Sequence, residues 1–322
     1  MTTDGAARRG WRVWAPRATL AVLLLCALAV AGMYVRGGRT SAGVVLAGGL
    51  PVTIAVALVA AALHWRHHGW LRLGVVAAIL VSQAPLLDHL VDDGTPSEPR
   101  ARTIRVATLN TQWSGPTDAE LAELASGTDV LALQEWEPER TDGLTEALGE
   151  DWRLVASDHD DYIGADVAVW ARRPWQVRSA APLAGRQPGS SLQLSRGEDH
   201  VTVIGTRLQN PAFLAADRWG EGLDSLRHAV EDADGPVIVL GDLNAPPSAV
   251  AFRRFARDAD LRPCTAQLGL GFPGTWGREP GSAVAPVPID HALTRHATCT
   301  DLEIRRERGS DHRALTATVA LD

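Results

Sequence analysis

The stretch PVIVLGDLNAPP, residues 236–247, carries four consecutive apolar residues directly into a glycine, an aspartate and an asparagine. Residues 237–240 are mostly β-branched, a pattern typical of a strand covered on both faces. Gly241 lets the chain turn without a Cβ atom, and Asp242 and Asn244 follow. Side chains two residues apart in an extended chain point to the same side, so these two could address one phosphate or one attacking water. The alternative is a strand followed by an ordinary Asx turn.

Similar apolar segments recur from residue 103 onward and also end in polar residues. We expect strands at residues 104–109, 130–133, 165–170, 201–206, 289–293 and 315–320, and helices at 118–125 and 218–230. The polar residues at or beside the strand ends are Asn110, Glu135, Asp242, Asn244, Asp290, Asp311 and His312. Strand ends are where an α/β or layered β architecture builds its site.

Carboxylates and amides dominate this set, and no Ser or Cys nucleophile stands beside a base. Oxygen ligands suit Mg²⁺ or Mn²⁺. Such an ion can neutralise phosphoryl charge and orient a water molecule. The pattern therefore predicts a divalent-metal site that acts on phosphate.

The N-terminal part of the chain is apolar from residue 18 to residue 88. Segments 18–35, 42–63 and 71–87 contain no acidic residue and are long enough to cross the ~30 Å hydrocarbon core of a bilayer. We therefore predict three transmembrane helices, although the first could instead be a secretory signal. The expected division is a cytoplasmic N-terminus at 1–17, a membrane anchor at 18–88, a linker at 89–102 and a catalytic domain at 103–322.

The flanking arginines favour one orientation of these spans. Those before the first span are Arg8, Arg9, Arg12 and Arg17, and those between the second and third are Arg66 and Arg72. Only Arg36 and Arg39 lie in the other short loop. Because cytoplasmic loops carry an excess of basic residues, we expect the N-terminus in the cytoplasm and the catalytic domain outside it.

Charge and cysteine content add two constraints. The net charge of -7 argues against a protein that holds long nucleic acid by bulk electrostatics, while a local basic patch remains open. Cys264 and Cys299 both fall in the part expected to be exported, so a disulfide between them is conceivable and the sequence leaves it undecided.

Five ordered motifs resemble those of the endonuclease/exonuclease/phosphatase superfamily. They are RVATLNTQW at 105–113, LALQEWEP at 131–138, VIVLGDLNAPPS at 237–248, PIDHAL at 288–293 and GSDHRAL at 309–315. The resemblance implies an α/β fold, a four-layer α/β sandwich of two packed β-sheets flanked by helices, and a divalent-metal phosphoesterase. Three spans before an exported domain also resemble the VanJ-type membrane phosphatases of actinobacteria, which are associated with undecaprenyl pyrophosphate.

The resemblance also implies a metal site. Glu135 resembles the principal metal-ligating carboxylate, and Asn110 and Asp311 are expected near the same Mg²⁺ or Mn²⁺ ion. Each has a structural alternative: Glu135 could cap a turn, and Asn110 could belong to an Asx turn.

The remaining motif residues are expected to act on the substrate. Asp242 resembles the group that orients or deprotonates the attacking water, and Asn244 resembles a donor to a phosphate oxygen. His312 would stabilise charge on the pentacoordinate phosphorus, and Asp290 would hold its imidazole in position. His291 has no assigned role and is interpreted as structural.

The chain departs from the family pattern at Arg207. The segment VTVIGTRLQNP at 201–211 resembles a strand that usually ends in Thr-His-Leu, and Arg207 stands where that histidine is expected. The loss of the histidine counts against a DNase. An arginine would instead bind a second phosphate, which leads us to expect Arg207 to be substrate-binding. The alternative is that Arg207 points away and pairs with a surface carboxylate.

The favoured interpretation is a membrane-anchored, extracytoplasmic, Mg²⁺-dependent phosphatase of a lipid-linked pyrophosphate such as undecaprenyl pyrophosphate. Its expected partners are a phosphorylated lipid and membrane lipids; nucleic acid is a less favoured partner, and no protein partner is inferred. The alternatives are a surface nuclease or phospholipid phosphodiesterase, and a catalytically inactive module that binds phosphorylated lipid.

Overall fold

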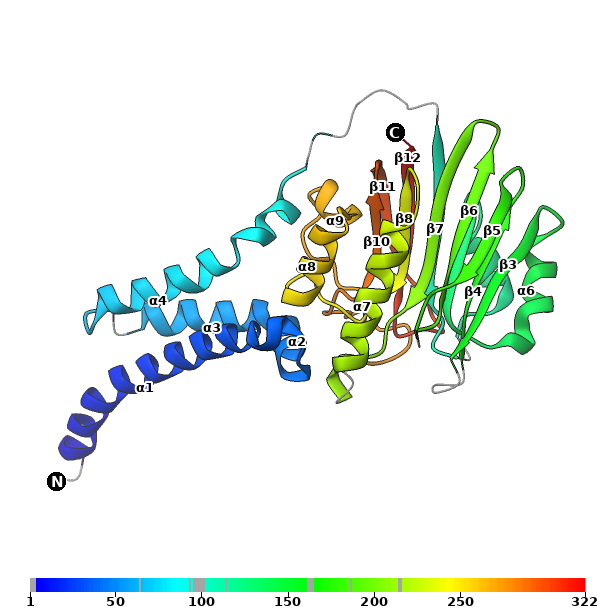
Figure 1. The fold of residues 1–322 in the computed structure, drawn as a ribbon. Coiled ribbons are helices and arrows are strands. Elements are labelled where there is room, and N and C mark those ends of the chain that lie inside the picture. Colours follow the sequence, from blue (N-terminus) through cyan, green and yellow to red (C-terminus); the bar gives the residue numbers. More distant parts are fainter. Residues whose placement is uncertain are drawn as a thin grey trace.

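The computed structural model describes residues 4–63, 65–92, 94, 102–113, 115–160, 165–185, 187–213 and 216–321. A group of N-terminal helices extends to one side of a larger domain that contains all the strands (Figure 1).

The larger domain is built on two six-stranded mixed sheets. The first sheet has the order β11 (Ala297–Arg306), β12 (Arg313–Leu321), β1 (Thr103–Asn110), β2 (Val130–Trp136), β4 (Ala165–Arg172) and β3 (Trp152–Asp160). The second has the order β5 (Gln176–Pro182), β6 (Gly189–Arg196), β7 (Asp199–Arg207), β8 (Val237–Asp242), β10 (Asp290–Arg295) and β9 (Arg262–Pro263). The pairs β1–β2 and β7–β8 are parallel, and the other neighbours are antiparallel.

The sheets pack face to face, with helices on their outer faces. Val106 of β1 and Val203 and Ile238 of the second sheet belong to the apolar core between the sheets. Helices α5 (Asp118–Leu124) and α6 (Thr141–Leu148) cover the first sheet, while α7 (Ala216–Glu231) and α8 (Val250–Asp258) cover the second. The predicted arrangement of two packed sheets flanked by helices is confirmed.

The strands and helices expected in this domain are all present, at bounds close to those predicted. Elements that the sequence analysis did not anticipate are the helices α6, α8 and α9 (Cys264–Gln267) and the strands β3, β5, β6, β9 and β11. Strand β5 illustrates the reason, because almost all of its residues are exposed at a sheet edge and it lacks an apolar alternation.

The predicted membrane spans differ from the structure. Within α1 (Asp4–Gly32), the segment Trp14–Gly32 is the one unbroken helix among the described residues that is long and apolar enough to cross a membrane. The second predicted span is a pair, α2 (Ser41–Gly48) and α3 (Leu50–Ala62), bent by 66°. The third is α4 (Gly69–Ser82) followed by the 3₁₀ helix η2 (Ala84–Leu90), bent by 61°. The expectation of three continuous helices therefore requires correction to one, or to three if each bent pair is a single span.

The bends have a local cause. Pro51 and Pro85 each stand in the first turn of the second helix of a pair. Proline has no N–H group and is tolerated in a first turn, where that group would have no partner within the helix. Each proline therefore favours a new helix over continuation of the preceding one.

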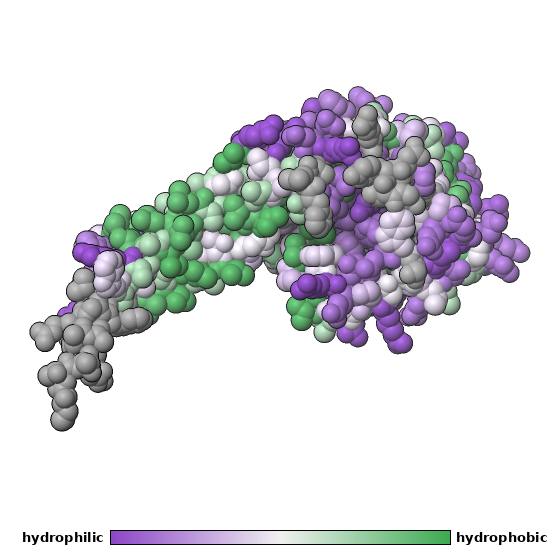
Figure 2. All heavy atoms as spheres, turned by 90° about the horizontal axis from the view of Figure 1, so that it is seen from below, coloured by the Kyte–Doolittle hydropathy of each residue, from purple (hydrophilic) through white to green (hydrophobic). Residues whose placement is uncertain are grey.

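The N-terminal helices contact the second sheet's helical layer and the loop after β8. The Ser248 hydroxyl donates to the backbone oxygen of Ala47 in α2 at 2.7 Å. Arg39 donates to the Asp224 carboxylate of α7 with an Nη1–Oδ2 distance of 2.7 Å. The exposed surface of these helices is largely apolar, whereas that of the larger domain is mostly polar (Figure 2).

Two further side-chain arrangements bear on the sequence analysis. Cys264 and Cys299 form a disulfide, with Cα atoms 5.4 Å apart, that joins α9 to β11. Arg72 is fully buried, and its guanidinium donates to backbone oxygens of Pro16, Ala60 and Leu63 among others. Arg72 therefore ties three helices together and does not lie exposed in a loop, which weakens its use as an orientation signal.

Candidate active site

The strand pairing brings the predicted polar residues to one edge of the sandwich. In the second sheet Asp242 is paired with Arg207 on one side and with Asp290 on the other. In the first sheet Asn110 pairs with Gln134, the residue before Glu135. Because β1, β2, β7 and β8 run in matching parallel pairs, their carboxyl ends carry these side chains to the same region.

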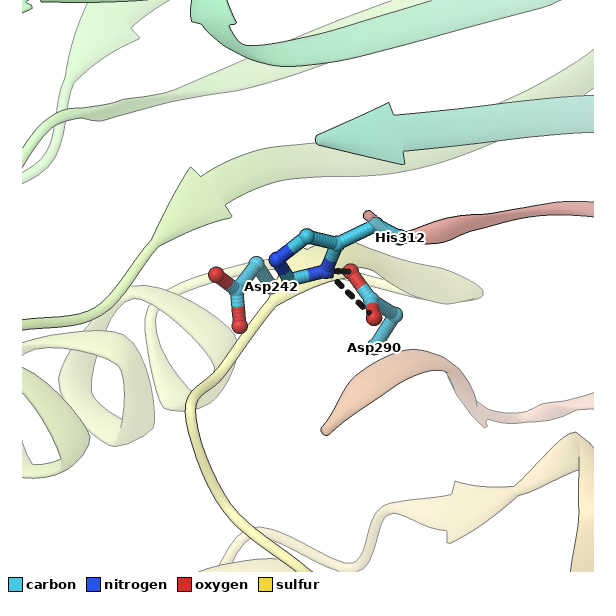
Figure 3. A group of neighbouring side chains, drawn as sticks. All are labelled: Asp242, Asp290 and His312. Carbon is cyan, nitrogen blue, oxygen red and sulfur yellow. Dashed lines mark hydrogen bonds and ion pairs between the residues drawn. The ribbon is translucent and has the colours of Figure 1, made fainter. Parts of the chain in front are cut away.

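His312 lies between Asp242 and Asp290 (Figure 3). Its Nδ1 atom is 3.0 Å from Oδ1 and 2.9 Å from Oδ2 of Asp290, and both residues are buried. Burial lowers the pKa of the imidazole, but the Asp290 carboxylate, with help from Asp242 and Asp311, raises that pKa to about 9. His312 is therefore held as a cation at neutral pH, as a group that stabilises phosphoryl charge requires.

Asp242 is the most enclosed carboxylate of the site. Its Oδ2 accepts from the Asn110 side-chain amide at 3.1 Å, and its Oδ1 accepts from the backbone N–H of Asn244 at 2.9 Å. Burial raises the pKa of Asp242 to about 6, although the nearby His312 opposes the change. A carboxylate with a pKa of this size can accept a proton from water more readily than an ordinary aspartate.

The loop after β8 is shaped by two backbone conformations with positive φ. Gly241 has φ of +140°, and a Cβ atom there would lie 1.9 Å from the backbone oxygen of Thr206. Asn244 has φ of 48°, a conformation that asparagine tolerates. Its side-chain amide donates to the Leu208 backbone oxygen at 2.8 Å and to Asp242 Oδ2 at 3.1 Å. In this conformation Asn244 supports the loop and Asp242, so donation to a phosphate would require one of these bonds to be exchanged.

Glu135 and its neighbours form the region predicted to hold a metal. The Asn110 amide nitrogen donates to Glu135 Oε1 at 3.1 Å, and its oxygen accepts from the backbone N–H of Gln112 at 3.0 Å. Asn110 thus orients Glu135 through its nitrogen. Asp311 accepts from Trp276 Nε1 at 3.0 Å, and burial, with a contribution from Glu135, raises its pKa.

The charges of the cluster fit a divalent cation. Four carboxylates, those of Glu135, Asp242, Asp290 and Asp311, surround the cations of Arg207 and His312. The four carboxylates therefore exceed the two cations by two negative charges. Oxygen donors with an excess charge of this size suit Mg²⁺ or Mn²⁺.

A second possible ligand set lies beside the first and shares no residue with it. Ligand atoms of Asp242, Asp290 and His312 lie within 4.8 Å of one another. The sequence motifs did not indicate these three residues as a metal site. Within this set, His312 Nδ1 is hydrogen-bonded to Asp290. Glu135 and Asp311 remain the proposed ligands.

Arg207 points into the site. Its Nη2 lies 2.7 Å from Glu135 Oε1, and its Nε lies 3.9 Å from Asp242 Oδ2. Only 12% of its side chain is exposed, and its Nε has no hydrogen-bond partner among the described residues. The alternative in which Arg207 turns away to a surface carboxylate is wrong. The guanidinium instead contacts the carboxylate predicted as the principal metal ligand.

Other residues that support the site were not singled out from the sequence. Gln112 Oε1 accepts from the Asp311 backbone N–H at 3.0 Å, and the Ser310 hydroxyl donates to the Asn110 backbone oxygen at 2.6 Å. Both lie inside quoted motifs, so their position in the motif was a usable signal. Trp276 carried no such signal, because it lies outside every motif.

His291 has the structural role expected of it. Its Nε2 lies 2.7 Å from the Ala245 backbone oxygen, and its ring stacks on Phe252 with centroids 4.6 Å apart. Burial lowers the pKa of His291 to about 4, so the ring is neutral at physiological pH. It braces the loop after β8 and does not take part in the charged cluster.

Two mixed sheets packed face to face, with carboxylates, amides and a histidine gathered at the strand ends, define a phosphoesterase class of α/β sandwich. The model of the Endonuclease/Exonuclease/phosphatase family matches residues 107–312, and the chain belongs to that family. Members of the family are hydrolases that act on phosphoester bonds and are typically dependent on a divalent metal.

Solved structures share the fold. A family protein from Bacteroides thetaiotaomicron is similar with a TM-score of 0.57 and 13% identity, covering 68% of this chain and 98% of that one. A mannosyl-6-phosphatase from the same species has a TM-score of 0.54 and 12% identity, with 68% and 100% covered. D. rerio TDP2 complexed with a single-strand DNA product has a TM-score of 0.55 and 15% identity, with 67% and 98% covered. No curated protein matches the chain significantly.

Proposed function

We propose that this protein is a membrane-anchored, extracytoplasmic phosphatase that hydrolyses a lipid-linked pyrophosphate, such as undecaprenyl pyrophosphate, with Mg²⁺ or Mn²⁺. The metal, held by Glu135 and Asp311 with Asn110 beside them, would supply charge neutralisation at the phosphoryl group and orient water. Proton transfer and the binding of the phosphoryl oxygens are carried out by side chains of the catalytic cluster.

Asp242 and His312 divide that chemistry between them. Asp242 accepts a proton from the attacking water, for which its raised pKa of about 6 suits it. His312, cationic and held by Asp290 at 2.9 Å, donates toward the negative charge that develops on the phosphoryl oxygens. Asn244 fixes the position of Asp242 from the following loop.

Arg207 favours a phosphoanhydride over a phosphodiester. A phosphate leaving group is a weak base and needs charge neutralisation more than protonation, whereas an alkoxide benefits from a general acid. Arg207 is permanently cationic, lies within the site, and has an unpartnered Nε among the described residues. A forked guanidinium is suited to binding a second phosphate.

The observation that carries the choice of a membrane substrate is the bond between Ser248 and Ala47. The hydroxyl of Ser248, only a few residues beyond Asp242 and Asn244, donates at 2.7 Å to the backbone of α2. The catalytic loop is thereby attached to the apolar helices, which supports a substrate presented at the bilayer surface.

Two features support placement outside the cytoplasm. The arginines before the first span favour a cytoplasmic N-terminus, and with three spans the domain then lies on the other side. A disulfide such as Cys264–Cys299 persists in oxidising compartments and is rare in the cytosol.

The test is a substrate panel on the purified full chain in lipid nanodiscs with Mg²⁺. We expect phosphate release from undecaprenyl pyrophosphate, with little cleavage of plasmid DNA or of a phospholipid diester. Glu135→Gln and Asp242→Asn serve as inactive controls for contaminating activity. Preferential cleavage of DNA or of the diester would establish an alternative, and no hydrolysis with retained lipid binding would indicate an inactive module.

A further inference from the structure

A cavity lies between α8 and the ends of the N-terminal helices that face the catalytic domain. It has a volume of about 500 Å³, and its lining includes Tyr34, Pro247, Phe252, Arg253, Arg254 and Arg257. None of these residues belongs to the catalytic cluster. The cavity combines apolar walls with several guanidinium groups, which is an unusual local composition in a chain of net charge -7.

The arginines come from one face of α8. The sequence VAFRRFARD buries Val250, Phe252 and Phe255 in the domain. Arg253, Arg254 and Arg257 occupy the other face, where Arg254 and Arg257 are exposed and Arg253 is half-buried. Helical geometry places residues three and four apart side by side, so the three guanidinium groups gather along one strip.

The contacts of Arg253 show where this strip of arginines lies along the apolar N-terminal helices. Its Nη2 lies 3.2 Å from the hydroxyl of Tyr34, and its Nη1 lies 3.3 Å from Oε1 of Gln83. Tyr34 follows the apolar segment that ends at Gly32, and Gln83 follows α4, which ends at Ser82. The guanidinium therefore lies just beyond the end of the first apolar segment and at the bend between α4 and η2, which is the level of lipid headgroups if the first segment crosses a bilayer.

Two of these arginines have no acidic partner in the part of the chain that the structure describes. Arg253 bonds to a neutral amide and a neutral hydroxyl, and no ion pair joins Arg254 to a described carboxylate. Arg257 pairs with the exposed Asp258 at 2.8 Å. Four arginines and one carboxylate, that of Asp88, line the cavity, which therefore carries an excess of positive charge, in contrast to the negative excess of the catalytic cluster.

We propose that this cavity binds the phosphate of an anionic phospholipid in the leaflet next to the catalytic domain. A guanidinium pair binds a phosphodiester, and the apolar wall formed with Phe252 and Leu261 suits the glycerol and first acyl carbons. Free inorganic phosphate would make no use of that wall. The proposal rests on the membrane anchoring within the proposed function and is independent of the catalytic substrate.

The bound lipid would also steady the catalytic loop. Pro247 lines the cavity and lies three residues after Asn244, next to the Ser248 that bonds to α2. An occupied cavity therefore holds α8 and this loop against the bilayer. The lipid acts as a positioning ligand and takes no part in the reaction.

The test uses the full chain in nanodiscs of phosphatidylcholine with a minor fraction of spin-labelled phosphatidylglycerol. We expect the parent protein to immobilise part of the labelled phosphatidylglycerol. In the Arg253→Gln/Arg254→Gln variant, the affinity for this lipid should fall roughly tenfold. The matched control is Arg172→Gln/Arg173→Gln, an equal charge change at the end of β4, on the side of the domain away from the N-terminal helices (Figure 1). Equal immobilisation in both variants would overturn the proposal.

Further measurements distinguish a lipid phosphate from free phosphate as the ligand, and separate this proposal from the proposed function. Displacement of the labelled lipid by inorganic phosphate as readily as by unlabelled phosphatidylglycerol would show a free-phosphate site and overturn the lipid assignment. A chain that does not enter nanodiscs would overturn the anchor and this inference together. A chain that enters them and immobilises phosphatidylglycerol, yet releases no phosphate from lipid pyrophosphate, would overturn the proposed substrate and support the lipid site.

Discussion

The Nδ1 atom of His312 lies 3.0 and 2.9 Å from the two carboxylate oxygens of Asp290, in the interior of the catalytic cluster. The two residues come from different strand ends, and the bond fixes both the orientation of the imidazole and its charge. The opposite ring nitrogen, Nε2, faces Asp242 (Figure 3) and lies 3.8 Å from Oδ1 of Asp311. His312 is therefore a cation that Asp290 holds in position, and the two residues can be tested separately.

Replacing Asp290 should impair the reaction through His312. We expect Asp290→Asn to lower kcat by about 10²- to 10⁴-fold, because the amide cannot stabilise the imidazolium. Substrate affinity should change little. The measurement is kcat and KM for lipid pyrophosphate, with circular dichroism as a check on folding. A variant with the parental kcat would exclude a role for the pair.

The rate should depend on pH at both sides of neutrality. Burial raises the pKa of Asp242 to about 6, and its proton-accepting form is lost as the pH falls through that value. The pKa of His312, lowered by burial but raised more by Asp290, is about 9, and its cationic form is lost as the pH rises through that value. The pH profile should therefore be bell-shaped between these limits. In Asp290→Asn the alkaline limb should move to lower pH; an unmoved limb would assign it to another group.

The metal site should depend on Glu135 and Asp311. Glu135→Gln or Asp311→Asn should weaken Mg²⁺ binding and abolish most activity, because few oxygen ligands remain to hold a weakly bound ion. Calorimetric titration of Mg²⁺ measures binding without catalysis. Chelation should remove activity reversibly in the parent protein. Full activity of Glu135→Gln in the presence of chelator would contradict the assignment.

Arg207 should distinguish anhydride from diester substrates. Arg207→Ala should lower lipid pyrophosphate hydrolysis by about 100-fold, through loss of one preorganised cation at the second phosphate. Arg207→His should shift the balance toward diesters by supplying a general acid. Because Arg207 contacts Glu135 at 2.7 Å, both variants are compared at saturating Mg²⁺. If Arg207→Ala hydrolyses lipid pyrophosphate at the parental rate, then the role of Arg207 is limited to its ion pair with Glu135.

The orientation in the membrane can be measured with fusions after Asp322. We expect an alkaline phosphatase fusion to be active and a green fluorescent protein fusion exported in unfolded form to be dark, since the arginine distribution favours a C-terminus outside the cytoplasm. A fluorescent fusion without phosphatase activity would refute the extracytoplasmic placement.

The sequence alone determined the family, the two-sheet class of fold and the residues that meet at the strand ends. Apolar runs such as residues 237–240 predict buried strands, and each is followed by a polar motif residue. Parallel pairing carries Asn110 and Glu135 to one edge of the first sheet, and Arg207 and Asp242 to one edge of the second, because carboxyl ends of neighbouring parallel strands lie together. These features are local in sequence, and for that reason they could be predicted.

Only the tertiary structure decided how distant side chains divide their contacts. Arg207 could have faced solvent or the site, and its 2.7 Å contact with Glu135 depends on two sheets meeting. The Cys264–Cys299 pairing depends on α9 reaching β11. The arginines of α8 look like an ordinary exposed face until Tyr34 and the helix ends are placed beside them. Such relationships join segments far apart in the chain, and packing sets them where local pattern does not.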